Sequence, residues 1–176
     1  MTLVREYLDF KAKAAKGDAG AKVEFFIRAL KMGDFKKLEE AKKHLATLKG
    51  VSKEQKAAID GQLVGLEVRD LVQPLLQNQD RGKTPELLKS IGKKLLEMDK
   101  GGRVPAGDAD YGTFYSIILD YAEQEKNIPA FEKGLQALKD RFGDNLNQRF
   151  LSAKEEALEK LKAEKEEGNK DKPEGK

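Results

Sequence analysis

The sequence predicts an all-α protein. Apolar residues recur at helical spacing along most of its 176 residues, and glycines, prolines and capping residues separate the periodic stretches. No segment alternates apolar and polar residues for long enough to suggest a sheet. Because helices of about 15 residues are marginally stable alone in water, each predicted helix must bury its apolar stripe against neighbours.

The clearest unit is a predicted helical hairpin over residues 108–142. A polar break at Gln124–Asn127 separates two apolar stripes, and Pro129 falls where the first turn of a helix tolerates proline. The stripes are Phe114, Ile117, Ile118 and Tyr121, followed by Phe131, Leu135, Leu138 and Phe142.

Before this hairpin, the boundaries of earlier helices can be predicted from capping residues. A first helix ends near Lys16; Asp18 caps a second, which stops at Gly33; Asp34 caps a third, which stops at Gly50.

Two further helices complete the middle of the chain. Ser52–Gln55 has the pattern of a capping box and opens a fourth helix, which Pro74 should end or kink near Gln73. Thr84–Pro85 is a cap followed by a first-turn proline and opens a fifth, which Gly101–Gly102 stop.

After the hairpin, Gly143–Asp144 reads as a stop followed by the cap of a closing helix. From Lys165 onward no residue is large and apolar, so residues 166–176 are predicted to be a disordered charged tail. The whole is predicted to be one domain, 1–165, with hairpins at about 18–50, 52–100 and 108–142 and a closing helix at 144–165.

Composition excludes several classes of function. There is no cysteine, so disulfides and thiolate metal sites are ruled out, and the only histidine is His44. The 34 basic and 31 acidic residues leave a net charge of +3, which is small for a dedicated nucleic-acid-binding protein. No apolar run is long enough to span a membrane. The N-terminus has no secretory apolar core, which leaves a cytoplasmic protein or the mature part of an exported one.

Residues that resemble chemical motifs have simpler structural interpretations. Gly82–Thr84 ends like a phosphate-binding loop, but Gln77 stands where that motif requires glycine, and a helix precedes it. His44 has no ligand cluster at helical spacing, so a partly exposed surface histidine is expected. Carboxylate pairs such as Glu39–Glu40 alternate with lysines, as on a solvated helix face. The sequence therefore predicts a protein that is not an enzyme and has no metal site and no cofactor.

The predicted hairpin resembles the tetratricopeptide repeat (TPR) family. Phe114-x-x-Ile117-Ile118-x-x-Tyr121 in its first helix, and Ala130-x-x-x-Gly134-x-x-Ala137 in its second, are similar to the two signature helices of that repeat. Ile118 departs from the family's preferred glycine, and Gly134 from its usual aromatic residue. The resemblance implies stacked antiparallel helical hairpins that form a short right-handed TPR-like superhelix, with small residues where paired helices approach closely.

The resemblance also implies a function and a site. TPR-like superhelices bind peptides or proteins on a concave face lined by the first helix of each hairpin. Carried onto the central hairpin, this face would hold Tyr115, Leu119 and Glu123, as the partner-binding residues of a non-enzymatic scaffold. The alternative is that Tyr115 and Leu119 pack on a neighbouring helix.

Charge is distributed unevenly along the chain. Residues 34–56 and 80–103 each carry seven basic and four acidic residues, whereas 108–144 carry four basic and eight acidic. Such a field could orient a partner. Two other functions stay open: a helical accessory segment of a larger exported bacterial protein or complex, for example beside a thioredoxin-like domain, and nucleic-acid binding through the basic middle.

Overall fold

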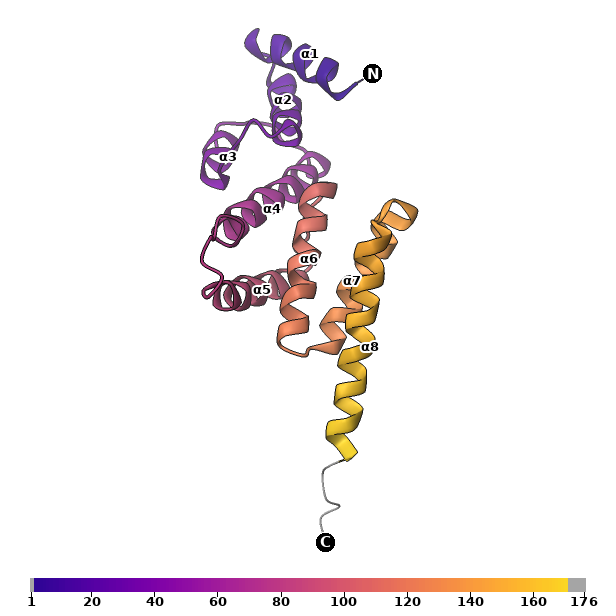
Figure 1. Cartoon of the computed structure of the whole chain (residues 1–176). Helices are drawn as coiled ribbons and strands as arrows, with labels where there is room; N and C mark the ends of the chain where they lie inside the picture. The colour runs from indigo at the N-terminus through magenta and orange to yellow at the C-terminus, as the bar shows by residue number, and fades with distance from the viewer. Residues whose placement is uncertain (1, 171–176) are drawn as a thin grey trace. The chain divides into compact units, whose positions relative to one another are not determined.

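A computed structural model describes residues 2–170, and within that range the only regular secondary structure is helical (Figure 1). The predicted all-α class is confirmed. The α-helices are α1 Leu3–Ala15, α2 Ala19–Met32, α3 Leu38–Leu45, α4 Lys53–Leu76, α5 Thr84–Lys100, α6 Asp108–Gln124, α7 Ile128–Phe142 and α8 Gln148–Lys170, with a short 3-10 helix, η1, at Gly143–Asn145.

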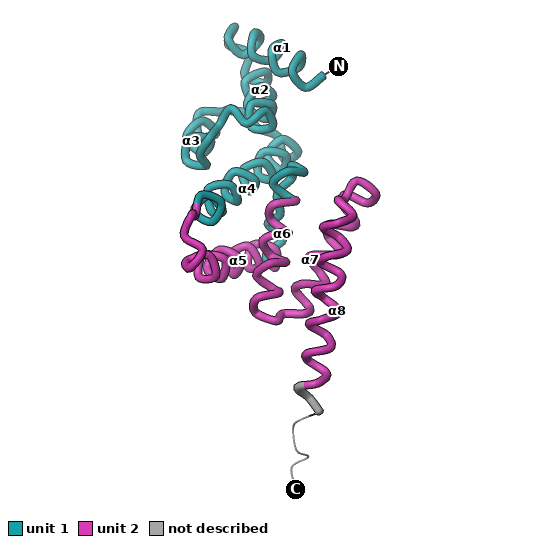
Figure 2. The backbone as a smooth tube through the Cα atoms, in the orientation of Figure 1, with its two compact units in different colours: residues 1–77, 101–111 teal, residues 78–100, 112–176 magenta. Residues whose placement is uncertain are grey.

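The chain forms two compact units that are interleaved in sequence (Figure 2). Unit 1 combines residues up to Gln77 with 101–111, and unit 2 combines 78–100 with the residues from Gly112 onward. The sequence suggested a single domain because no linker or change of composition marks this division. The first turn of α6 belongs to unit 1 and the rest of the helix to unit 2.

The core of unit 1 lies between α2, α3 and α4. Asp18 and Ser52 cap α2 and α4 as predicted, and Ser52 forms the full capping box with Gln55. The buried cluster consists of Val23, Phe26, Ile27, Leu30, Ala41, Ile59 and Leu66.

Both predicted boundaries of the third helix are wrong, since α3 begins at Leu38 and ends at Leu45, well before Gly50. Asp34 does not cap α3, because its carboxylate accepts the Tyr7 hydroxyl (2.5 Å). Instead, the Leu38 amide at the start of α3 donates to the carboxylate of Asp70 on α4 (3.1 Å). Helix α4 continues through Pro74 to Leu76, so of the two outcomes predicted at Pro74, an end near Gln73 is wrong.

In unit 2, helices α5 and α7 approach α6 closely. A Cβ at Gly92 of α5 would lie 2.3 Å from the Cβ of Tyr121, so only glycine allows this approach. On α7, a Cβ at Gly134 would lie 3.3 Å from Leu119 Cδ2. The predicted close approach of the hairpin helices at Gly134 is therefore confirmed.

The closing helix differs from its prediction at both ends. Asp144 lies in η1, and the cap of α8 is Asn147, whose side chain accepts the amides of Arg149 (3.0 Å) and Phe150 (3.2 Å). Helix α8 continues to Lys170, so a disordered tail is wrong for residues 166–170. Residues 171–176 of the predicted tail lie outside the described range.

Candidate functional site

Two of the three predicted partner-binding residues are buried. Tyr115 is 4% exposed and Leu119 is 0% exposed, so the prediction that they form an exposed patch is wrong. The alternative, that they pack on neighbouring helices, agrees with their burial. Tyr115 contacts Asp99 of α5, and Leu119 lies beside Gly134 of α7. Glu123 is exposed on the last turn of α6.

Tyr115 belongs to a buried polar contact between three helices. Its hydroxyl donates to Asp99 Oδ1 (2.8 Å), and Lys133 Nζ donates to Asp99 Oδ2 (2.6 Å). Asp99 is 6% exposed and sits in the last turn of α5, where the helix dipole disfavours an anion. The two donors offset that cost, so this group acts as a brace joining α5, α6 and α7.

Glu123 is already engaged within unit 2. Lys154 of α8 donates to Asp120 (2.7 Å) and Glu123 (2.9 Å), and its side chain is only 15% exposed. Burial has the largest single effect on the Lys154 pKa and lowers it. The two carboxylates together outweigh burial and raise the pKa above its ordinary value. Much of the negative charge predicted to select a partner is thus balanced internally.

A different surface has the features of a binding site. In unit 1, helices α3 and α4 and residues 102–104 enclose an open groove of about 510 Å³, which we call the α3–α4 groove. We call its half-buried apolar side chains the floor and its charged side chains the rim. The floor residues are Leu38, Leu63, Val64 and Val104, and the rim residues are Lys42, Asp60, Glu67 and Arg103, with Gly61 and Gly102 between them.

Two contacts near the end of the 101–111 segment fix that wall of the groove. The Ala106 amide donates to the Gly61 carbonyl (3.1 Å), and Arg69 makes a bidentate ion pair with Asp110 (2.7 and 2.8 Å). The hydrogen bond from Arg69 to Asp110 raises the pKa of the guanidinium. A Cβ at Gly65 would lie 2.6 Å from Asp110 Oδ2, so glycine is needed for this ion pair to form against α4.

The charged side chains of the rim differ in whether another residue of the chain forms an ion pair with them. Glu67 is ion-paired with Arg103, and Lys42 lies 3.4 Å from Glu39. Asp60 makes no ion pair within residues 2–170. It is therefore the rim charge most open to a cation from outside the chain.

Unit 2 has a second, smaller groove of about 440 Å³ near the start of α8. It carries no charged side chain. Its lining residues are Gly112, Ser116, Leu138, Phe142, Asn145, Leu146, Asn147 and Phe150. The sequence predicted neither groove, since each lining is assembled from segments that are separated along the chain.

Other kinds of site find no geometric support in the part of the chain that the structure describes. No three side chains of His, Asp or Glu there are grouped to hold a metal ion. His44 is half-buried, stacking on Phe26 (ring centroids 5.1 Å apart) and lying near Phe35 (5.6 Å). No helix among residues 2–170 is both long enough and apolar enough to cross a membrane.

Comparisons with protein-family models, with curated proteins and with solved structures give no match to this chain.

Proposed function

We propose that this chain is a non-enzymatic protein–protein interaction scaffold that binds a peptide segment of a partner in the α3–α4 groove. The observation that carries the proposal is an open groove of about 510 Å³ with an apolar floor and a charged rim. Such a volume is in the range of ligand pockets, roughly 300–1,000 Å³, and accepts one or two side chains of a bound segment. The groove replaces the face around Tyr115 as the proposed contact surface.

The rim of the groove indicates the chemistry of the partner. An apolar side chain would rest on Leu63 and Val64, and a neighbouring Lys or Arg would pair with Asp60. A rim ion pair orients a partner more than it adds affinity.

We also propose that the helices stack as antiparallel hairpins in a short TPR-like superhelix. Supporting this are the three-residue connection between α6 and α7 and the close approach of α7 to α6 at Gly134. A crystal structure of the chain with a bound peptide would test the stacking and the binding surface together.

The binding test begins with peptides selected on the full chain from a random display library. Amide chemical shifts of the labelled protein then locate the bound peptide. The proposal expects the largest changes at Leu63, Val64 and Val104. Selected peptides that map only to other surfaces would contradict it.

A matched pair of variants sharpens the test. Val64→Lys places a charge on the groove floor and should weaken peptide binding at least about tenfold, as expected for loss of an apolar contact surface. Leu76→Lys makes the same kind of change at a side chain that is 70% exposed and outside the groove, and should leave affinity unchanged. Circular dichroism checks that both variants stay folded.

A further inference from the structure

Helix α1 of unit 1 presents an apolar strip to solvent. None of its residues is buried, and Val4 and Leu8 are 53% and 57% exposed. With about 100° of rotation per residue, Val4, Leu8, Ala12 and Ala15 lie within roughly a quarter of the helix circumference. We call these four residues the α1 strip.

The opposite side of α1 attaches it to α2. Tyr7 packs against Phe25 (ring centroids 5.2 Å apart), and the guanidinium of Arg28 lies over Phe10 (4.3 Å from the ring centroid). The α1 strip therefore faces away from α2.

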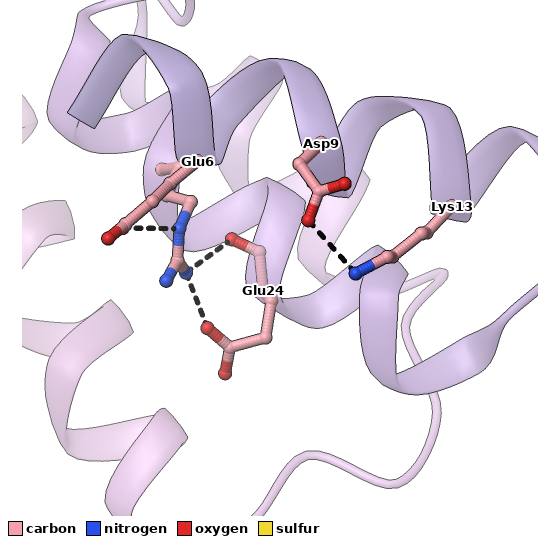
Figure 3. A network of polar contacts seen from close by, with 5 residues as sticks. Glu6, Asp9, Lys13 and Glu24 are labelled. Atoms are coloured by element: carbon pink, nitrogen blue, oxygen red, sulfur yellow. Dashed lines mark hydrogen bonds and ion pairs between the residues drawn. The ribbon is translucent and has the colours of Figure 1, made fainter. Parts of the chain in front are cut away.

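The acidic residues of α1 are each paired with a cation (Figure 3). Glu6 accepts from Arg28 of α2 (3.2 Å), which also pairs with Glu24, and Asp9 accepts from Lys13 (2.9 Å). By the same rotation, Glu6 lies on the side of the helix opposite the strip, whereas Asp9 lies about 100° from Leu8, beside the edge that carries Arg5 and Lys16. The charge of Asp9 at that edge is offset by its ion pair with Lys13.

Three cations flank the strip. Lys11 lies along one edge, and Arg5 and Lys16 lie along the other. None of them makes an ion pair within residues 2–170, although Lys11 Nζ lies 5.6 Å from the centroid of the Tyr7 ring. An exposed apolar strip with cations on both edges is typical of helices that lie in a membrane interface.

We propose that α1 docks unit 1 onto an anionic lipid surface, with its axis in the plane of the interface. Leu8 and Val4 enter the boundary between head groups and acyl chains. The long side chains of Arg5, Lys11 and Lys16 reach the anionic head groups on either side. The contact is reversible and weakened by salt, because the strip is short and much of the attraction is electrostatic.

The same observations disfavour two other occupants. Two copies packed strip to strip would bring cationic edges together. A protein partner usually inserts an anchor side chain into a pocket, and no residue of the α1 strip lines either groove described above. A bilayer interface needs no pocket. This inference is independent of the function proposed for the α3–α4 groove.

The test is co-sedimentation of the full chain with vesicles in about 0.1 M salt. Vesicles of phosphatidylcholine alone are compared with vesicles that also contain about 30% phosphatidylserine. The proposal expects at least about fivefold more protein bound to the anionic vesicles. It also expects this binding to fall as salt is added.

Two variants remove the two parts of the surface separately. Leu8→Ser removes the largest exposed apolar side chain of the strip. The triple variant Arg5→Gln, Lys11→Gln and Lys16→Gln removes its cationic edges. Each should reduce binding to anionic vesicles at least about fivefold, while thermal melting confirms that the exposed substitutions leave the fold intact.

Matched controls make the same chemical changes elsewhere. Leu76→Ser alters another exposed leucine, and Lys43→Gln with Lys53→Gln and Lys56→Gln removes three charges from unit 1 outside α1. Both controls should bind as the unmodified chain does. Three results would overturn the proposal: no binding to anionic vesicles, equal losses in the controls, or self-association in solution that Leu8→Ser abolishes, which would identify a second copy as the occupant.

Discussion

Two glycines determine how closely the helices of unit 2 approach. We predict that Gly92→Ala destabilises the protein by at least about 2 kcal/mol. The added Cβ would overlap Cβ and Cγ of Tyr121, which are held close to the backbone and cannot move aside. Gly134→Ala should destabilise the protein less, since the nearest atom to the added Cβ is a terminal methyl group of Leu119, which can shift by a side-chain rotation. Denaturant unfolding monitored by circular dichroism measures both.

Gly112 provides the control for these substitutions. A Cβ there would meet nothing closer than 3.8 Å, so Gly112→Ala should stabilise the helix by about 0.5–1 kcal/mol through its better helix propensity. Similar effects at positions 92 and 112 would show that α5 and α6 are farther apart than described.

The hydroxyl of Tyr115 is expected to matter for stability. Tyr115→Phe keeps the buried ring but removes one of the two donors to Asp99, at a cost of about 1.5–3 kcal/mol for a hydrogen bond to a charged group. Thermal unfolding measures the loss. Tyr121→Phe is the control, because that ring is also buried while its hydroxyl makes no hydrogen bond within residues 2–170. Equal melting temperatures for the two variants would contradict the role of Tyr115 as part of a brace.

Glu24 is expected to make the free energy of unfolding depend on pH. A hydrogen bond from Gln55 (2.7 Å) and the pairing with Arg28 lower its pKa below the ordinary 4.5 in the folded state. The stabilisation is therefore complete above that value and is lost as pH falls through the lower, folded pKa. The free energy of unfolding of Glu24→Gln should thus fall less steeply below pH 4.5 than that of the unmodified chain. Parallel curves for the two proteins would refute this contribution.

At the scale of helices, local caps could be predicted but distant ones could not. Asp18 and Ser52 cap the turn that follows them, and their signals lie within four residues. Asp70 caps α3 from more than thirty residues away, so no residue near Leu38 could have predicted this cap. Asp34 was the obvious local candidate, but its carboxylate accepts the hydroxyl of Tyr7 instead.

The start of α8, where Asn147 and not Asp144 is the cap, allows a direct test. Asn147→Ala removes the side chain that accepts two amides of the first turn and should cost about 1 kcal/mol. Asp144→Ala, at the predicted cap, should change stability by less than half as much. Urea unfolding of both variants measures the difference, and the reverse order would restore the boundary suggested by the sequence.

Helix α6 shows why the predicted site failed. The apolar stripe of α6 indicates one buried face, but the buried residues extend beyond that stripe to Tyr115 and Leu119, up to the edge of a polar face that carries Asp120 and Glu123. Its sequence correctly gave a helix and a close approach to α7. It could not show that Tyr115 also contacts α5, because its partner there, Asp99, lies in a helix outside the predicted hairpin.

At the scale of the whole molecule, unit 1 is complete only when residues 101–111 are present. These residues supply Asp110 to Arg69, Ala106 to Gly61 and one wall of the α3–α4 groove. The groove was not predictable from sequence for the same reason, since its lining joins residues near 40, 60 and 103.

A chain that ends at Gln77 should therefore fold less stably than the same residues in the full protein. We expect faster amide hydrogen exchange in the middle of α4, around Gly61 and Gly65, than in the full chain. Helix α2, whose buried residues face α4 and α3, should lose less protection. Unchanged exchange around Gly61 would mean that residues 101–111 add little to unit 1.

The interleaving of the two units also constrains how the chain can fold while a ribosome is making it. Unit 1 is not complete until residues 101–111 have left the exit tunnel, and by then the whole of α5 has already emerged. Helix α5 belongs to unit 2, and the α6 side chains that cover Gly92 are synthesised later still. The nascent chain thus exposes Ile91 and Leu95 for an interval set by translation speed, and this apolar segment is where a ribosome-associated chaperone would bind.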